Sequence, residues 1–343
     1  MDKNPMVSIL MPVYNGRDYL RPAIDSLLNQ TFRDFEIVLV NDGSTDDSQE
    51  IIDSYNDPRI ITLKQKNQGV ARSLNNGLKV ARGKYIRRHD ADDISTPDSI
   101  GMQVDFLENH PDYVMVCTQT AFMTSNGKIA MDYRLPQIKY FGGKSSRDLV
   151  LDDFKPDRAA PAVHGTAFYR RQEVLDIGCY RPEFIVSEDN DLWMRLLEKY
   201  KIAILNNCTY FIRIHGQSAT NIHVNKIQHF RNLLQEFSKQ RKETGTDPIM
   251  RGETVPPPPP AEKPAETAHV KYPKGKYLRE DLQYMYGLVL NAKDCKLIRK
   301  YGGEMLRDGW KMPKTYRLLL FPILGKGFVN MGVRVKSFFR GKS

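Results

Sequence analysis

Residues 85–93 read Tyr85-Ile86-Arg87-Arg88-His89-Asp90-Ala91-Asp92-Asp93. The first part of this stretch has the composition of a short strand, and the second part places three carboxylates within four residues. Because carboxylates this close repel one another, the cluster needs a partner of opposite charge. Mg²⁺ and Mn²⁺ prefer carboxylate and phosphate oxygens, and their sites commonly combine one or two carboxylates with substrate phosphates. The alternative is an acidic turn that precedes a helix beginning near Thr96-Pro97.

Strand-like and helix-like segments alternate along the chain up to this stretch. Apolar runs predict strands at 7–12, 35–40, 60–63 and 84–89. Apolar side chains at helical spacing predict helices at 19–28, 51–55 and 70–81. Alternation with short connections predicts an α/β fold with a mostly parallel, Rossmann-like sheet and helices on both faces.

Polar segments follow three of the predicted strands. Pro12–Gly16, Asn41–Ser44 and Asp90–Asp93 each begin where a strand ends. Ligands of parallel α/β sheets bind at the carboxyl ends of the strands, so we expect these segments to meet in one crevice. Asn15-Gly16 and Asp42-Gly43 are also common turn pairs, and a structural role is the alternative for them.

Five segments resemble, in their order and spacing, motifs of the family 2 glycosyltransferases, which have the GT-A fold. They are Pro12–Gly16, Asn41–Asp46, Gln68–Asn75, Asp90–Asp93 and Ser187–Trp193. The resemblance covers roughly residues 5–220. It implies an inverting glycosyltransferase that takes its sugar from a nucleotide-sugar, with UDP as the expected carrier, and that uses Mn²⁺ or Mg²⁺.

The resemblance also implies a role for each matched residue. The nucleotide-sugar would be bound by Pro12, Tyr14, Asn15, Asp42, Arg72, Asn75, Asp90 and Asp93. The metal would be held by Asp92 and Asp90, with His215 of the segment Phe211–Ser218 as a further ligand. Asp42 would accept a hydrogen bond from the ring N–H of uracil. Arg72 and Asn75 have an alternative as the polar face of a helix.

Glu188 and Asp189 open a further predicted helix. Acidic residues at a helix N-terminus are favoured by the helix dipole, and that is the structural alternative. The resemblance implies that Asp189, with Glu188 beside it, is the general base that deprotonates the hydroxyl of a glycan or lipid-linked acceptor. Attack opposite the leaving nucleotide would then invert the anomeric centre.

Two other functions remain open at this point. One is a non-catalytic, membrane-associated scaffold for glycan assembly, which the intact acidic clusters argue against. The other is a sugar nucleotidylyltransferase, which usually carries a Gly-rich phosphate loop after its first strand. Pro12–Gly16 is not such a loop.

The segments between the motifs are predicted from local pattern. We expect helices at 102–110, 147–154 and 173–177, and strands at 113–117 and 163–170. His164 is interpreted as a structural residue, and His89 as a half-exposed one without a ligand role.

Composition divides the chain into four parts: a catalytic domain over 1–220, a helix over 221–242, a Pro-rich linker over 243–275 and a basic helical region over 276–343. Residues 271–343 hold 17 Lys and Arg against 5 Asp and Glu. This charge fits either attachment to a membrane surface or packing on the catalytic domain, and we find no nucleic-acid-binding motif. Four scattered cysteines, no signal peptide and no apolar run of about 20 residues predict a cytoplasmic protein, peripheral on the inner face of the membrane.

Overall fold

The computed structural model describes residues 4–123, 129–131, 146–154, 161–213, 215 and 224–258. Contacts divide the chain into two units, residues 1–213 with 217–267, and residues 214–216 with 268–343. The linker beyond residue 258 and the basic region predicted over 276–343 lie outside the described residues. The domain boundaries drawn from composition therefore stay a prediction.

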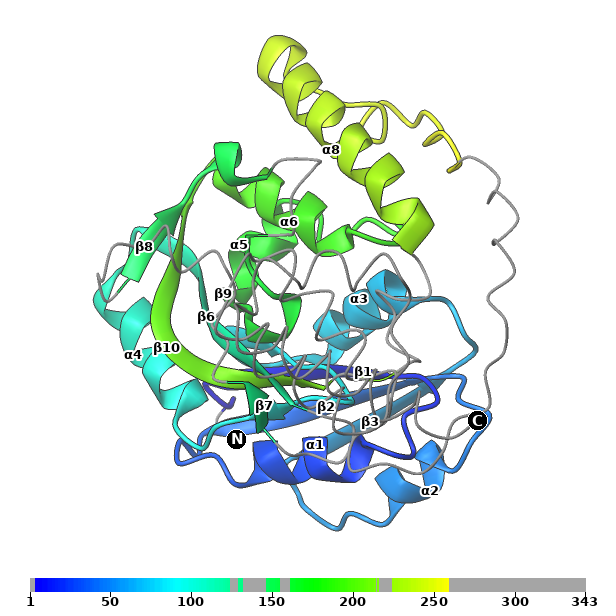
Figure 1. Cartoon of the computed structure of the whole chain (residues 1–343), viewed down its shortest axis with the longest axis vertical. Coiled ribbons are helices and arrows are strands. Elements are labelled where there is room, and N and C mark those ends of the chain that lie inside the picture. Colours follow the sequence, from blue (N-terminus) through cyan, green and yellow to red (C-terminus); the bar gives the residue numbers. More distant parts are fainter. Residues whose placement is uncertain are drawn as a thin grey trace, which may run out of the picture. The chain divides into compact units, whose positions relative to one another are not determined.

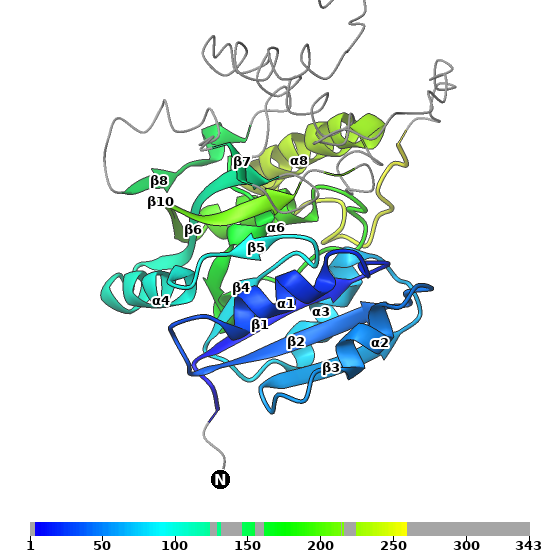
Figure 2. The same cartoon turned by 60° about the horizontal axis from the view of Figure 1, so that its bottom comes forward.

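A mixed sheet forms the centre of the first unit (Figures 1 and 2). Its described strands are β1 (Val7–Val13), β2 (Phe35–Asp42), β3 (Ile60–Gln65), β4 (Tyr85–Arg88), β5 (Ile94–Ser95), β6 (Tyr113–Met123), β7 (Ile129–Met131), β8 (Ser146–Leu149), β9 (Phe168–Arg170) and β10 (Lys201–Arg213). Their order is β3-β2-β1-β4-β9-β6-β10-β5, with β7 beside β6 and β8 beside β10. The strands β1 to β4 are parallel, whereas β9 runs antiparallel to both of its neighbours.

Helices cover both faces of the sheet, as predicted. The α-helices are α1 (Leu20–Leu28), α2 (Ser48–Asp53), α3 (Val70–Val80), α4 (Ser99–Asn109), α5 (Arg171–Asp176), α6 (Glu188–Leu197) and α8 (Val224–Thr244). One core contains buried side chains of α1, α2 and α4, and the other contains those of α3, α5, α6 and α8. Figure 2 shows α1 and α2 in front of the first strands and α3 behind them.

The alternation of side chains along each strand explains the two cores. In β1, Ile9 and Met11 belong to the core under α1, whereas Leu10 belongs to the core under α3. Successive side chains of a strand point to opposite faces, and a strand buried on both faces is apolar at nearly every position. The apolar runs of β1 and β2 are therefore central strands of a covered sheet, whereas the run at 60–63 belongs to the edge strand β3.

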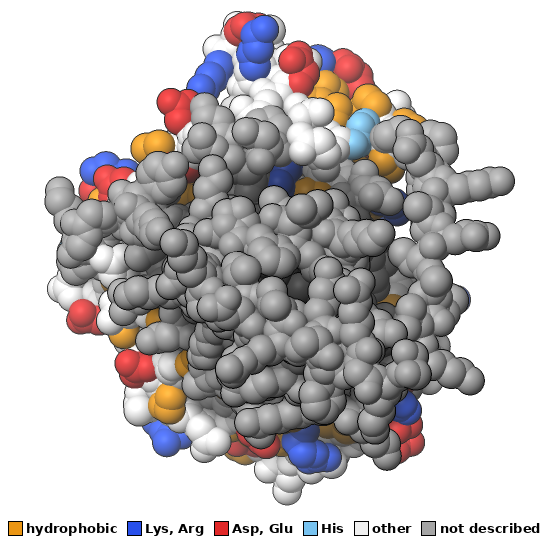
Figure 3. Space-filling model, viewed as in Figure 1, with side chains coloured by type: hydrophobic (Ala, Val, Ile, Leu, Met, Phe, Trp, Pro, Cys, Tyr) orange, Lys and Arg blue, Asp and Glu red, His pale blue; other side chains and the backbone are white. Residues whose placement is uncertain are grey.

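Helix α8 is held firmly against α6. Phe230 and Phe237 pack edge-on against Phe184, with ring centroids 5.9 Å away in each case. The Arg241 guanidinium donates to both oxygens of Glu198, at 2.8 Å each, and to Asp247. Helix α8 (Val224–Thr244) falls largely in the segment predicted as a helix over 221–242, and it belongs to the first unit (Figure 1). Charged side chains of both signs lie on its upper end in Figure 3.

Two local predictions are wrong. Residues 147–154 do not form a helix, because Ser146–Leu149 pairs as strand β8 with the edge of β10, and a single 3₁₀ turn over Leu151–Asp153 follows. Residues 163–170 form a strand only from Phe168, since His164–Thr166 is a 3₁₀ turn. Gly165 in this turn lies directly against Tyr210. A Cβ at residue 165 would be 2.2 Å from the Tyr210 hydroxyl, so a larger residue does not fit there.

Candidate active site

The ends of β1, β2 and β4 meet, as the sequence predicts. The backbone N–H of Asn15 donates to Ser44 Oγ at 3.0 Å, and Asn15 Oδ1 accepts from the N–H of Thr45 at 2.8 Å. The Cβ position of Gly16 lies 3.7 Å from Ala91 Cβ in the acidic loop. Asn15 has the left-handed backbone (φ 50°) that Asn tolerates better than most residues. Tyr14 beside it is 54% exposed and free to meet a ligand.

Asp42 fastens the start of α3 to the end of β2. Its carboxylate accepts from the backbone N–H groups of Gln68 and Gly69, at 2.9 Å each, and from Gln65 Nε2 at 2.7 Å. A carboxylate has about four acceptor positions, so one remains for a ligand. The three bonds fix the direction in which that remaining lone pair points.

The two α3 candidates lie differently. Both ends of the Asn75 amide bind the backbone of Tyr180: Nδ2 donates to its carbonyl at 2.8 Å, and Oδ1 accepts from its N–H at 3.1 Å. Arg72 is exposed. A role of either residue in nucleotide-sugar binding stays a prediction.

The three acids after β4 lie among charged and hydroxyl groups from β4 and β10. Asp90 pairs with the buried Arg88 and accepts from the Tyr210 hydroxyl at 3.2 Å. Arg213 at the end of β10 donates its N–H to Asp93 Oδ1 and its Nε to the carbonyl of Asp92, at 2.7 Å each. Burial, with Asp92 and Asp90 adding repulsion, raises the pKa of Asp93 well above its usual value. Asp92 itself is half-buried.

His89 is fully buried, so the prediction that it is half-exposed is wrong. Its ring packs edge-on against Tyr210, with centroids 5.1 Å apart. Burial and the neighbouring Arg87 lower the pKa of His89 to about 3, so the imidazole is neutral at physiological pH. In that state Nδ1–H donates to the carbonyl of Asp90 at 2.7 Å. His89 therefore stabilises the backbone at the start of the acidic loop through this hydrogen bond.

Glu188 and Asp189 form the first turn of α6. The residue before them, Ser187, has a left-handed backbone (φ 64°), an uncommon state for a residue other than Gly, Asn or Asp. Burial and the charge of Asp189 raise the pKa of Glu188 to about 8. Burial raises that of Asp189 to about 6, although the N–H of Asn190 and the charges of Arg88 and Arg231 lower it. A carboxylate with a pKa near 6 suits a general base at neutral pH.

The raised pKa values predict how the stability of the protein depends on pH. A carboxyl whose pKa is higher in the folded than in the unfolded protein binds more protons when folded, so its contribution to the free energy of unfolding falls as pH rises. For Glu188 this fall begins near its ordinary value of 4.5 and ends near 8. Glu188→Gln should therefore raise Tm, and the gain should be at least about 2–4 °C larger at pH 9 than at pH 5.

Thermal melts of the two proteins across this pH range check the expectation. Glu183→Gln serves as the matched control, because Glu183 precedes the same helix but is exposed. A gain that does not change with pH would show that Glu188 is ionised in the folded protein throughout.

The acidic cluster has donors suited to a hard divalent cation. Within the described ranges there is no group of three His, Cys, Asp or Glu side chains that would hold an ion alone. Mg²⁺, however, is usually bound by one or two carboxylates together with substrate phosphates, and Asp92 and Asp90 supply two. These residues therefore fit such an ion once a diphosphate is present. His215 belongs to the second unit, and its role as a ligand stays a prediction.

Three residues of the site were missed by sequence reasoning: Arg88, Tyr210 and Arg231. Arg213 falls in the segment Phe211–Ser218 that resembles the family, but it was given no role of its own. Arg88 lies two residues before Asp90, and this position was its only signal. Tyr210 and Arg213 come from β10, about 120 residues from the carboxylates that they contact. Arg231 lies on α8, and no motif marks that helix.

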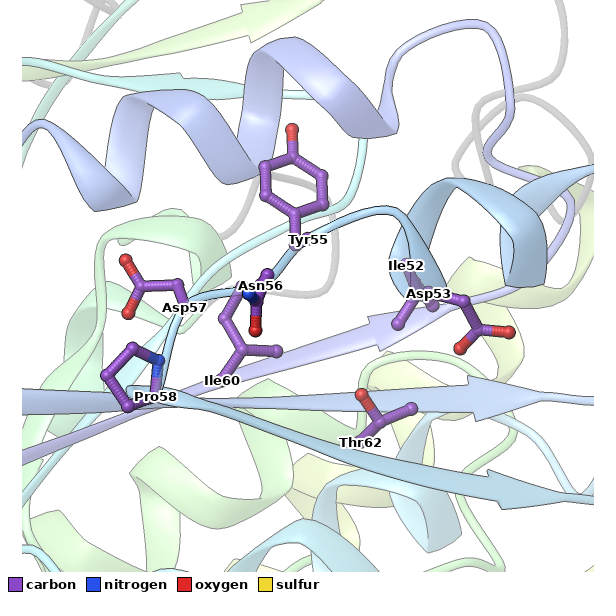
Figure 4. A pocket seen from close by; sticks show the side chains of 8 residues that line it. All are labelled: Ile52, Asp53, Tyr55, Asn56, Asp57, Pro58, Ile60 and Thr62. Atoms are coloured by element: carbon purple, nitrogen blue, oxygen red, sulfur yellow. The ribbon is translucent and has the colours of Figure 1, made fainter.

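A separate pocket lies between α2 and β3, away from these residues. Figure 4 shows its lining, Ile52, Asp53, Tyr55, Asn56, Asp57, Pro58, Ile60 and Thr62. Tyr55 points from it towards α1, where its hydroxyl donates to Asp25 at 2.7 Å. The lining belongs to the end of α2 and the beginning of β3. The pocket therefore lies near the amino ends of the parallel strands, whereas the carboxylates follow their carboxyl ends.

Comparison with solved structures gives the fold class of the protein. The crystal structure of S. aureus TarS 1–349 in complex with UDP-GlcNAc matches with a TM-score of 0.52 at 17% identity, over 85% of this chain and 82% of that chain. At this identity the match establishes the fold, which is GT-A-like.

Sequence comparison gives the family. The family model "Glycosyl transferase family 2" matches residues 8–178. An uncharacterized glycosyltransferase of Rickettsia prowazekii is 31% identical over 241 residues, 69% of this chain and 73% of that protein. Chondroitin synthase of Pasteurella multocida is 31% identical over 245 residues, but this chain covers 24% of its length. The chain belongs to glycosyl transferase family 2 and is a glycosyltransferase.

Proposed function

We propose that the protein transfers a sugar from a UDP-sugar to a hydroxyl of a glycan or lipid-linked acceptor, with inversion at the anomeric carbon. The observation that carries this proposal is the meeting of three strand-end loops, with the carboxyl pair Glu188 and Asp189 at the start of α6 in the same unit. The likeness to chondroitin synthase supports a glycan acceptor.

Asp42 is the residue that would recognise the base. Its free acceptor position suits the ring N–H of uracil, whereas cytosine has no proton on that nitrogen. Pro12 lies near the end of β1, and Tyr14 and Asn15 lie on the loop that follows it, where the three would contact the nucleoside. Asp42→Asn should therefore weaken UDP binding more than it changes the turnover of bound donor.

Asp189 would take the proton from the acceptor hydroxyl as its oxygen attacks the anomeric carbon. The bond to the diphosphate breaks on the opposite side of the sugar, so one displacement inverts the centre and no covalent enzyme intermediate forms. Asp92 and Asp90 would hold Mn²⁺ or Mg²⁺, and the bound ion would stabilise the charge of the departing diphosphate. Arg88 neutralises Asp90, and Arg213 orients Asp92 and Asp93.

A panel of nucleotide-sugars tests the proposed function. Isothermal titration with UDP-, CDP- and GDP-sugars in the presence of Mn²⁺ should show binding of UDP-sugars, and hydrolysis of the bound donor should follow. Preference for a CDP- or GDP-sugar would contradict the role given to Asp42. NMR of the anomeric proton of the product should show the configuration opposite to that of the donor.

The basic C-terminal region is proposed to bind an anionic membrane surface. No helix in the described part of the chain is both long and apolar enough to cross a bilayer. From Thr315 onward the sequence has six basic residues and no acidic one. Each contributes at most about 1 kcal/mol near an anionic leaflet, and salt weakens this attraction.

Removal of residues 315–343 should therefore release the protein from anionic vesicles and leave donor hydrolysis unchanged. Co-sedimentation at two salt concentrations, beside a thermal melt, measures both properties. If sedimentation is unchanged and Tm falls, the region packs on the protein instead.

A further inference from the structure

Tyr210 of β10 makes two hydrogen bonds to Asp90, one to its backbone and one to its side chain. The backbone N–H of Asp90 donates to the Tyr210 hydroxyl oxygen at 3.1 Å. The same hydroxyl donates its own hydrogen to Asp90 Oδ2 at 3.2 Å. A phenolic hydroxyl can donate one hydrogen bond and accept another at the same time, so the two bonds are compatible. Together they fix both the main chain and the carboxylate of Asp90.

The Tyr210 side chain is itself held in one position. It is fully buried and contacts the His89 ring edge-on, with centroids 5.1 Å apart. The Arg87 guanidinium lies 5.6 Å from the centroid of the tyrosine ring and donates to Ser95 Oγ of β5 at 3.2 Å. Gly165 closes the space beside the hydroxyl, because a Cβ there would be 2.2 Å from the oxygen. The hydroxyl is therefore a fixed point to which the acidic loop is attached.

The two oxygens of the Asp90 carboxylate have different surroundings. Oδ2 pairs with Arg88 and accepts from Tyr210. Oδ1 takes no hydrogen bond or ion pair from any residue in the part of the chain that the structure describes. The Asp90 side chain is 32% exposed, whereas that of Arg88 is 6% exposed. The protein therefore occupies one oxygen of this carboxylate and leaves the other for a ligand.

We propose that Tyr210 is a positioning residue for the divalent cation: it directs Oδ2 of Asp90 into the protein, so that the other oxygen is presented to the ion. This inference rests on the proposed function, in which Asp90 and Asp92 bind Mn²⁺ or Mg²⁺. Arg88 lies on the strand that leads into the same loop, whereas Tyr210 ties this loop to β10. A neutral hydroxyl also orients the carboxylate without cancelling the charge that attracts the ion. Because Mg²⁺ demands near-ideal octahedral geometry, the direction of each ligand matters for its binding.

Tyr210→Phe tests this inference in the full chain, because it removes the hydroxyl and keeps the ring that packs against His89. UDP is titrated at a series of Mn²⁺ concentrations. The Mn²⁺ concentration that gives half of the gain in UDP affinity should be about 10–100-fold higher than in the parent, the usual effect of losing a hydrogen-bond partner of a metal ligand. The affinity for UDP in EDTA should stay the same, whereas a general loosening of the site would lower it. Tyr113→Phe is the matched control, since its hydroxyl also binds an aspartate, Asp148, but at the start of β6.

Hydrogen exchange of the Asp90 amide in the metal-free protein checks the geometry by itself. This amide should exchange about tenfold faster in Tyr210→Phe than in the parent, which is the worth of one hydrogen bond. If Mn²⁺ gives the parent no gain in UDP affinity, the proposed metal site is wrong and the inference is wrong with it. If the parent shows the gain, and Tyr210→Phe has the parent's Tm and shows the gain at the same Mn²⁺ concentration, the inference alone is wrong. Unchanged exchange of the Asp90 amide in this variant would also contradict it.

Discussion

Asp189→Asn is expected to lower kcat by about 10²–10⁴-fold, because general base catalysis contributes that much. The amide keeps the size and hydrogen-bonding capacity of the side chain but cannot accept the acceptor's proton. Asp189 lies at the start of α6, and the UDP pocket is proposed around Asp42 at the end of β2, so the affinity for UDP should stay near that of the parent. Steady-state kinetics together with titration of UDP measures the two effects separately.

Asp105→Asn is the matched control for this variant. Asp105 is exposed on α4, where its carboxylate accepts only from Asn109 among the contacts of the described residues. It should change neither kcat nor affinity. If Asp189→Asn instead loses affinity for UDP with kcat preserved, Asp189 belongs to the donor site and another group is the base.

Asp92→Asn is expected to abolish transfer and to remove the effect of Mn²⁺ on UDP binding. An amide oxygen is a weaker ligand for a hard cation than a carboxylate, and only one or two protein carboxylates are expected to bind the ion. Titration of UDP with and without Mn²⁺ should show a gain in affinity for the parent and none for the variant. The fold should be unchanged, because Arg213 donates to the backbone carbonyl of Asp92 and to Asp93.

Excess EDTA gives an independent check on the parent protein. Full activity in EDTA, or normal turnover by Asp92→Asn, would contradict a metal at this position. Asp112→Asn is a suitable control, because Asp112 is an exposed carboxylate paired with Lys201, and exposed pairs contribute little to stability.

A strand was predictable from the sequence where its own residues show the apolar pattern of a buried strand. The strands β1 and β2 are apolar at nearly every position because both of their faces are covered, and this pattern is visible locally. Segment 147–154 was not predictable in this way. Its first residues become part of strand β8 (Ser146–Leu149) because β10, more than 50 residues further along the chain, offers them hydrogen bonds.

The residues of the site fall into the same two groups, those marked by a local pattern and those brought together only by folding. Asp42, Asp90–Asp93 and Glu188-Asp189 are short motifs, so the sequence marks them. No motif marks Tyr210 or Arg231, and Arg213 is marked only as part of the segment Phe211–Ser218. The folded chain brings all three to the acids. The burial of His89 likewise depends on Tyr210, which lies over its ring.

The docking of α8 has a consequence for where this enzyme can be divided and recombined. The match to the family model ends at residue 178. The segment Phe211–Ser218, the last one that resembles the family, ends at residue 218. A fragment that ends at residue 178 would lack Glu188 and Asp189 altogether. A fragment that ends at residue 218 would leave Phe184 without Phe230 and Phe237, and Glu198 without Arg241. It would also leave Asp189 without the opposing charge of Arg231. The exchangeable cassette therefore includes α8 and the segment through Asp247, which pairs with Arg181 and Arg241, and chimeras that alter the choice of sugar should be joined beyond it.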